Sequence, residues 1–195
     1  NYIGGRYSVL SEVGMLPAEL MGLNEKNFKK FNYLIKNKRF LENLIINVEN
    51  IIHYVKKNKK NSIILNYDES SENFFKWYQQ LTAESLGKKS KGITPIISSM
   101  PKDNHSLLQL YLDGPKNCFF TFFNVTSKTS NKQSNKFILD DKKYLKNKNL
   151  SEILEAQEKS TQNIFRKKNI PFRSFNIKKK DENTLGELFC FCVLE

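Results

Sequence analysis

Apolar residues recur along the chain in two alternating patterns, one with helical spacing and one made of short unbroken runs. Residues 27–41 and 42–55 carry apolar positions three and four apart, which is the spacing of an amphipathic helix. The run at 62–66 is apolar in its interior and polar on both sides, as in a strand that is buried on both faces. The chain therefore passes from a helical region into a buried strand.

The same alternation continues to the end of the chain. We expect further strands at residues 92–98, 117–123 and 171–177, and further helices at 72–85, 104–113, 150–167 and from 183 onward. Strands that alternate with helices of this length predict an α/β fold with a mainly parallel sheet covered on both faces. Residues 124–139 are polar and lack helical period, so we expect a loop or a poorly ordered excursion between sheet units there.

Three smaller signals mark where helices begin and end. Residues 9–23 are apolar and are broken by Pro17, which suits the first turn of a second short helix because proline lacks the N–H that would be unpaired there. Ser70 or Ser71 can cap the helix at 72–85, and Gly87 lies where that helix is expected to stop.

The size and composition of the chain limit the class of protein. Its 195 residues, 39% of them hydrophobic, suffice for one domain and part of another. No apolar run approaches the roughly 20 residues of a membrane span, and we expect no membrane partner and no secretory signal. The chain starts at Asn1 rather than Met and stops at Glu195 within an apolar run, so we expect it to be a piece of a longer protein.

The cysteines and the net charge also guide the prediction of partners. Three cysteines and two histidines show no metal-ligand spacing, so we expect no metal, and a reducing cytoplasm fits best. The net charge of +12 suggests a nucleic-acid binder. However, the lysines lie in asparagine-rich runs without the interleaved aromatic residues that stack on bases, so we expect no nucleic acid as a partner.

Glu84 is a candidate general base. Gln80 and Glu84 are four positions apart and share one face of the helix predicted at 72–85. Glu84 lies in the last turn, where the negative end of the helix dipole disfavours its ionised form, as is useful for a base near neutral pH. The alternative is an ordinary surface glutamate at a helix end.

The two histidines receive different interpretations. His105 stands in the first turn of the helix predicted at 104–113, where the positive end of the dipole favours a neutral imidazole that can take or give a proton. The alternative is a histidine that is simply exposed at a helix start. His53 lies among apolar residues of a helix that ends in a lysine cluster, and we interpret it as structural.

The opening of the chain places an arginine after two glycines. We expect Gly4 and Gly5 to permit unusual backbone angles and a close approach of the backbone to a ligand. The donor fork of Arg6 matches a phosphate or an enediolate, whereas the alternative is a helix-capping contact or an inter-domain ion pair. Residues 87–90 lack the glycine spacing of a phosphate loop, and we reject that interpretation.

Taken together, three stretches of the chain resemble the phosphoglucose isomerase (glucose-6-phosphate isomerase) family. The opening NYIGGRYSVLSEVG is similar to the arginine signature of that family, QQLTAESLGK at 79–88 to its catalytic-glutamate segment, and DNHS at 103–106 with LDGPKN at 112–117 to its histidine segment. The order and rough spacing of the three agree with the family. Glu12 and Leu86 depart from the usual residue types, but neither position is a catalytic one.

The resemblance implies a three-layer α-β-α sandwich of the sugar-isomerase type, with the active site at the junction of two domains and at a dimer interface. Residues 1–50 would be the end of the first sugar-isomerase domain with linking helices, and 51–195 the second domain, truncated at its C-terminus. In the family the phosphate-binding serine and threonine loop lies before the segment that matches Asn1, and a lysine that assists ring opening lies after the segment that matches Glu195.

The resemblance also implies a cytoplasmic enzyme that interconverts glucose 6-phosphate and fructose 6-phosphate in glycolysis and gluconeogenesis. Glu84 would move the proton between C1 and C2, and Arg6 would stabilise the enediolate, with Gly5 letting the backbone approach and Gln80 binding hydroxyls or positioning Glu84. His105 would act in ring opening at the site of the partner subunit of a homodimer. No cofactor is expected.

Three other functions compete with this one. A related isomerase that also accepts mannose 6-phosphate would use the same Glu84. A non-catalytic regulatory domain would bind a sugar phosphate without needing a base, so the joint presence of Arg6, Gln80, Glu84 and His105 argues against it. A nucleic-acid binder would show steeply salt-dependent association.

Overall fold

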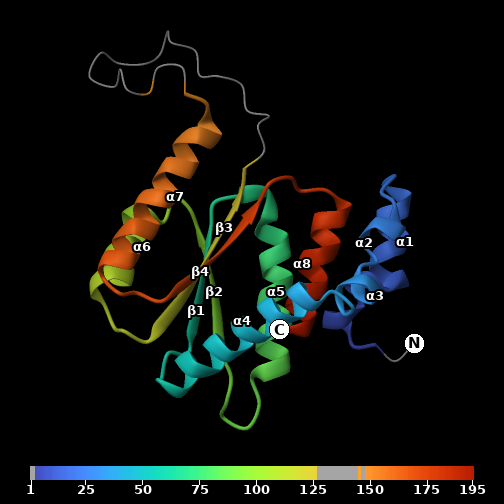
Figure 1. Ribbon diagram of the computed structural model, residues 1–195, viewed down its shortest axis with the longest axis horizontal. Helices are drawn as coiled ribbons and strands as arrows, with labels where there is room; N and C mark the ends of the chain where they lie inside the picture. The colour runs from blue at the N-terminus through green and yellow to red at the C-terminus, as the bar shows by residue number, and fades with distance from the viewer. Residues whose placement is uncertain (1–2, 127–144, 146–147) are drawn as a thin grey trace. The chain divides into compact units, whose positions relative to one another are not determined.

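The computed structural model describes residues 3–126, 145 and 148–195, and Figure 1 shows the arrangement of their helices and strands. The elements in chain order are η1 (Gly5–Leu10), α1 (Glu12–Leu20), α2 (Glu25–Phe28), α3 (Phe31–Leu34), α4 (Lys38–Lys56), β1 (Asn61–Asn66), η2 (Glu69–Ser71), α5 (Glu72–Leu86), β2 (Thr94–Ser99), α6 (Asn104–Asp113), β3 (Cys118–Val125), α7 (Leu150–Lys167), β4 (Phe172–Ile177) and α8 (Glu182–Leu194).

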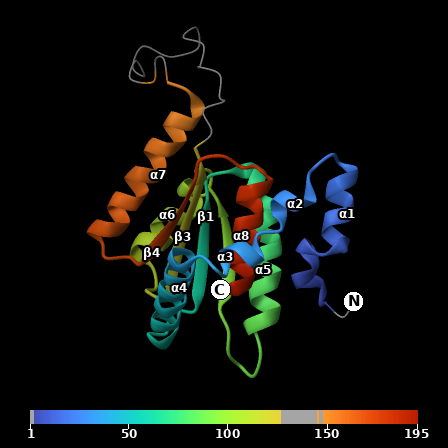
Figure 2. The ribbon, with the colours of Figure 1, turned by 45° about the vertical axis from the view of Figure 1, so that its right-hand side comes forward.

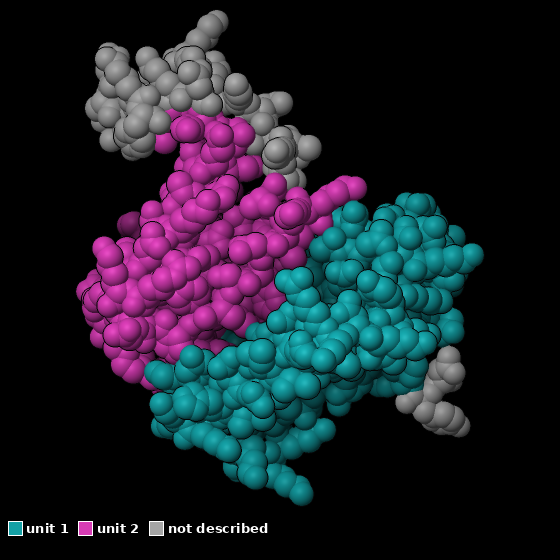
Figure 3. Space-filling model, in the orientation of Figure 1, with its two compact units in different colours: residues 1–62, 73–96, 180–195 teal, residues 63–72, 97–179 magenta. Residues whose placement is uncertain are grey.

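The chain divides into two compact units, which Figure 3 shows in different colours. Unit 1 consists of Asn1–Ser62, Asn73–Ile96 and Lys180–Glu195, and unit 2 of Ile63–Glu72 and Ile97–Lys179. The boundary that we expect at residue 50 lies between the first and the second sugar-isomerase domain. A division into compact units by spatial contact does not test that boundary. That boundary therefore stays a prediction.

In the described residues four strands form a parallel sheet in the order β2-β1-β3-β4. In the pairing of β3 with β4, Phe120 lies opposite Phe172 and Phe123 opposite Phe175. Every residue from 62 to 66 and from 119 to 124 is buried, so both faces of the two central strands are covered. The predicted α/β class, a parallel sheet between helices, is confirmed.

The core of unit 2 is built largely from aromatic rings. Phe165 of α7 is fully buried, and its ring meets Phe120 edge-on with centroids 4.8 Å apart and Phe122 edge-on at 5.3 Å. Edge-to-face pairs of this kind contribute about 1 kcal/mol each beyond the burial of their area. The buried cluster consists of Ile63, Leu65, Tyr67, Met100, Tyr111, Phe120, Phe122, Phe165 and Ile170.

In unit 1 the long helix α5 and the C-terminal helix α8 lie side by side in both views of the ribbon (Figure 1 and Figure 2). Trp77 and Phe74 of α5 pack on Phe189 of α8, with ring centroids 4.8 Å and 5.3 Å from it. A side chain at Gly186 of α8 would place a Cβ 2.4 Å from the carbonyl oxygen of Phe28, so α8 packs tightly on α2 there. The aromatic contacts with α8 hold α5, the helix that carries Glu84.

Two predictions about the first helices are wrong. Pro17 does not open a second helix, because α1 starts at Glu12 and Pro17 lies inside it. α1 starts before the predicted position because the chain passes directly from η1 into α1. The two backbones are close there, since a Cβ at Gly14 would lie 2.0 Å from the carbonyl oxygen of Val9. The helices expected at 27–41 and 42–55 are instead two short turns followed by α4, which Asn37 caps by accepting from the Phe40 amide at 3.1 Å.

The remaining elements follow the prediction within a few residues. α6 and α7 have the predicted bounds, and no bound of the other strands and helices differs from the prediction by more than two residues. Asn124 and Val125 continue β3, while most of the loop expected at 124–139 lies outside the described residues. None of the helices in the described part of the chain combines the length and apolar character that a membrane crossing needs.

Unit 2 also buries an acidic side chain. Glu158 of α7 is only 3% exposed, and its Oε2 accepts from Asn124 Nδ2 of β3 at 2.8 Å while its Oε1 accepts from Gln162 Nε2 at 2.8 Å. Burial raises the pKa of Glu158 above its ordinary value, although the two hydrogen bonds and Lys159 oppose this shift. The carboxylate is therefore less favourable in the folded than in the unfolded chain.

We predict that Glu158→Gln gains stability relative to the unsubstituted protein as the pH rises. A carboxyl with a raised folded-state pKa contributes stability below its unfolded pKa and loses that stability as the pH rises through the folded pKa. Glutamine does not ionise, so the melting temperature of the variant minus that of the unsubstituted protein should increase between about pH 4 and about pH 7.

The glutamine can accept only one of the two hydrogen bonds, so the variant starts from a lower stability, but its side chain adds no pH dependence of its own. Glu49→Gln, an exposed change on α4, is the matched control and should give a flat difference. A flat difference for Glu158→Gln as well would contradict the prediction.

Candidate active site

Arg6 lies in η1, a short turn of 3-10 helix that is closed by its own hydrogen bonds. The Ser8 hydroxyl donates to the Gly5 carbonyl at 2.8 Å, and the Tyr7 amide donates to the Gly4 carbonyl at 2.9 Å. Gly4 has ordinary angles, with φ −58° and ψ 145°, and neither it nor Gly5 has a positive φ. The expectation of unusual backbone angles at the glycine pair is therefore wrong.

The glycine at position 5 faces open space instead. A Cβ built on Gly5 would meet no atom within 4 Å, and the residue is exposed. Nothing inside unit 1 therefore requires a glycine there. An open backbone beside Arg6 is what the close approach of a ligand would use.

The backbone of Arg6 is attached to α5 by a tryptophan. Trp77 Nε1 donates to the Arg6 carbonyl at 2.9 Å, and its indole ring is itself packed against Phe74 and Phe189. A buried indole N–H normally finds an acceptor, and here the acceptor is the residue whose side chain forms the site. The aromatic packing of α5 on α8 thus also positions η1.

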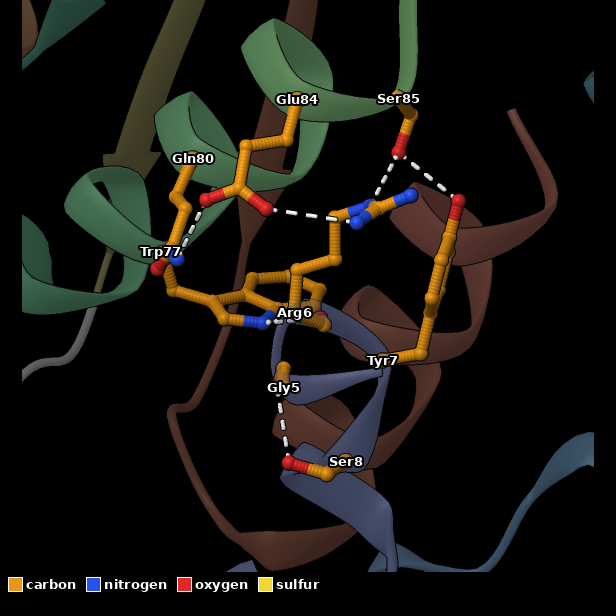
Figure 4. A network of polar contacts seen from close by, with 8 residues as sticks. All are labelled: Gly5, Arg6, Tyr7, Ser8, Trp77, Gln80, Glu84 and Ser85. Atoms are coloured by element: carbon orange, nitrogen blue, oxygen red, sulfur yellow. Dashed lines mark hydrogen bonds and ion pairs between the residues drawn. The ribbon is translucent and has the colours of Figure 1, made fainter. Parts of the chain in front are cut away.

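The guanidinium of Arg6 has partners on two adjacent residues of α5 (Figure 4). Its Nη1 lies 3.3 Å from Glu84 Oε2, and its Nε donates to Ser85 Oγ at 2.9 Å. Tyr7 supplies a third contact, since its ring centroid lies 4.7 Å from Arg6 Cζ and its hydroxyl lies 2.8 Å from Ser85 Oγ. The cation is therefore held by Glu84 and Ser85 and by the ring of Tyr7.

The second oxygen of Glu84 is bound by Gln80. Gln80 Nε2 donates to Glu84 Oε1 at 2.8 Å, as the four-residue spacing on α5 predicts. The side chain of Glu84 remains 49% exposed and that of Arg6 22%. The carboxylate is thus oriented from both sides and still open to a ligand.

The cationic environment also acts on Tyr7. Its hydrogen bond with Ser85 and then its contact with Arg6 hold the pKa of the Tyr7 phenol below its ordinary value, because both favour the phenolate. The surroundings of Arg6 thus favour a negative charge at Tyr7. The same surroundings suit an anionic ligand or a developing negative charge.

His105 lies in unit 2, as the second residue of α6, and it is exposed. The turn before it is fixed by Asp103, whose Oδ2 accepts from the Ser99 amide at 2.7 Å and from the Ser98 hydroxyl at 3.0 Å. The predicted place in a first helical turn is confirmed. His53 is exposed on α4, with its ring 5.5 Å from that of Tyr54.

Unit 2 contains a hollow of about 830 Å³ at the carboxyl ends of β3 and β4. Its lining consists of Asn124, Val125, Thr126, Asn149, Ser151, Glu152, Glu155 and Lys178. None of the predicted site residues is among them, so this hollow is not the candidate site. Within the described residues no three His, Cys, Asp or Glu side chains are grouped so that they could hold a metal ion.

The structure thus brings Arg6, Gln80 and Glu84 together in unit 1, and His105 belongs to unit 2. Sequence reasoning missed Tyr7, Trp77 and Ser85. Tyr7 and Ser85 lie inside the segments that carry the resemblance, directly beside the predicted arginine and glutamate. Trp77 is the single tryptophan of the chain and lies seven residues before Glu84 on the same helix, which is the one signal that could have found it.

Comparison with known proteins finds relatives that match almost the whole chain. The chain is 32% identical over 192 residues to the glucose-6-phosphate isomerase of Methanocaldococcus jannaschii, a match that covers 95% of this chain. It is 35% identical over 192 residues to the probable glucose-6-phosphate isomerase of Methanococcus maripaludis, with 96% of the chain covered. The chain belongs to the glucose-6-phosphate isomerase family.

The chain is much shorter than the relatives that it matches. The chain spans 47% and 43% of these two relatives, which is less than half of each. A solved structure of a hypothetical protein from Thermus thermophilus has the same fold, with a TM-score of 0.85 over 98% of this chain and 48% of its own, at 23% identity. No family model matches the chain.

Proposed function

We propose that the whole protein interconverts glucose 6-phosphate and fructose 6-phosphate, by aldose-ketose isomerisation through a cis-enediol(ate), in glycolysis and gluconeogenesis. The observation that carries this proposal is the Glu84 carboxylate, which lies between Arg6 Nη1 at 3.3 Å and Gln80 Nε2 at 2.8 Å. A base beside a fixed cation on an accessible surface is what proton transfer next to a carbonyl requires.

Glu84 acts as the base in this proposal. An aldose and its ketose share one enediol, so a single carboxylate that takes the proton from C2 can return it to C1. The two hydrogen bonds orient the carboxylate and restrict its rotation, which lowers the entropic cost of reaching the reactive geometry. Gln80 is a positioning residue for Glu84, and its remaining capacity can bind a sugar hydroxyl.

Arg6 stabilises the intermediate. Negative charge develops on oxygen in the enediolate and is absent from the open-chain sugar, so a preorganised cation lowers the barrier more than it strengthens substrate binding. The open space at Gly5 lets the sugar approach the backbone beside that cation. The phosphate would be held by a part of the whole protein that this chain does not contain.

His105 opens the sugar ring before isomerisation. A neutral imidazole can move a proton between the ring oxygen and the hydroxyl. We place it in the site of the partner subunit of a homodimer, which its exposed position at the start of α6 supports. The cytoplasm is the expected location, and a reducing compartment is supported by Cys118, Cys190 and Cys192, none of which forms a disulfide.

We predict that Glu84→Gln lowers kcat by about three to four orders of magnitude, because glutamine retains the shape of the side chain but cannot accept the proton. The measurement is conversion of fructose 6-phosphate to glucose 6-phosphate in a coupled assay, with the protein expressed from its complete coding sequence. Glu49→Gln, an exposed change of the same chemistry on α4, is the control and should retain full activity.

The outcomes separate the competing functions. An inactive unsubstituted protein that still binds sugar phosphate would favour the regulatory domain. Full activity of Glu84→Gln would remove Glu84 as the base while leaving the isomerase intact. Turnover of mannose 6-phosphate by the same active protein would identify the broader isomerase.

A second prediction tests the placement of His105. In a two-fold symmetric dimer whose sites each combine Glu84 of one chain with His105 of the other, a mixed dimer of Glu84→Gln and His105→Ala chains has one intact site. Co-expression of the two inactive variants should therefore restore about a quarter of the unsubstituted activity. Co-expression that restores nothing, although mixed dimers form, would show that His105 does not act in the partner's site.

A further inference from the structure

The side chain of Ser85 contacts both Arg6 and Tyr7. It lies in the last turn of α5, next to Glu84, and is half-buried. Its Oγ accepts from Arg6 Nε at 2.9 Å and lies 2.8 Å from the Tyr7 hydroxyl. The Ser85 hydroxyl thus bridges Arg6 and Tyr7, and the ring of Tyr7 also lies against the guanidinium of Arg6.

Two partners use the hydrogen-bond capacity of this hydroxyl. A serine hydroxyl has one hydrogen and two acceptor lone pairs, and the Nε–H of Arg6 occupies one lone pair. Tyr7 uses either the hydrogen or the second lone pair. Ser85 is therefore held in place by Tyr7 while it holds Arg6.

The guanidinium is consequently fixed at three points. Ser85 binds Nε, Glu84 binds Nη1, and the Tyr7 ring lies under Cζ at 4.7 Å. The Tyr7 hydroxyl also contacts the Arg6 side chain and can accept at most one further N–H, so at least one N–H of Nη2 remains for a ligand oxygen. Figure 4 shows this arrangement, with Glu84 and Ser85 approaching the guanidinium from one turn of α5.

We propose that Ser85 is a positioning residue of the isomerase, which sets the orientation of Arg6 and so keeps Nη2 available to the enediolate oxygen. This inference rests on the proposed function. Without the Ser85 hydroxyl the Nε–H loses its acceptor and the guanidinium is free to rotate. It can then turn a second N–H toward Glu84, which removes a donor from the substrate and ties up the base.

This mechanism predicts an effect on kcat rather than on substrate binding. The contact that is lost, between Arg6 Nη2 and the enediolate oxygen, forms only as the transition state is reached. Ser85→Ala should therefore lower kcat about tenfold and leave KM within about twofold. Ser174→Ala, an exposed change on β4, is the matched control and should leave both constants unchanged. The protein is again the one expressed from its complete coding sequence.

A double-mutant cycle distinguishes positioning from a structural role. Lysine in place of Arg6 keeps the charge but has no Nε–H for Ser85 to accept. Ser85→Ala should therefore lower kcat about tenfold with Arg6 present and leave it unchanged in Arg6→Lys. A purely structural effect would lower kcat equally in both backgrounds.

The outcomes are distinct. Equal losses in the two backgrounds, or an unchanged kcat in Ser85→Ala, would overturn the role of Ser85 and leave the isomerase standing. An unsubstituted protein without isomerase activity would overturn the proposed function and the role of Ser85 with it.

Discussion

An ion pair between residues 78 positions apart, Arg6 and Glu84, is the contact on which the site depends. It is not there for stability, since an ion pair with a half-exposed partner contributes at most about 1 kcal/mol. The surrounding structure nevertheless fixes both partners. Trp77 binds the backbone of Arg6, and its packing on Phe189 ties that backbone to α8. Rigid support for a weak, exposed ion pair is typical of a functional site.

The electrostatic balance of the pair fits the binding and the reacting roles that we propose for it. Glu84 neutralises part of the charge of Arg6, and Gln80 takes up the second carboxylate oxygen. A substrate that brings negative charge to Arg6 and a proton to Glu84 uses both groups at once. Unit 1 thus holds both the carboxylate and the cation that the proposed reaction uses.

Much of the fold could be predicted from the sequence, because its elements have strong local signals. α7 begins where Asn149 and Glu152 form a capping box, and the buried run of β3 contains four phenylalanines. The short helices before α4 could not be found in this way. Their bounds depend on close backbone contacts, such as that of Gly14 with Val9, which no periodicity reveals.

The candidate site shows the same division. The four-residue spacing of Gln80 and Glu84 fixes their shared face, so their hydrogen bond could be predicted from the sequence. The contacts of Arg6 with Ser85 and Trp77 join segments that are far apart in the chain, and they exist only because η1 folds against α5. The local sequence pattern thus identified the candidate side chains, whereas the tertiary contacts determine which of these side chains contact one another.

The central claim, that Glu84 moves a carbon-bound proton, is tested most directly by isotope exchange. Glucose 6-phosphate is incubated in deuterated water with the protein expressed from its complete coding sequence, and the C2 hydrogen is followed by NMR. The account predicts that deuterium enters C2 with the unsubstituted protein and that Glu84→Gln, although still folded, exchanges none above background. Undiminished exchange in Glu84→Gln would contradict it, because another group would then carry the proton.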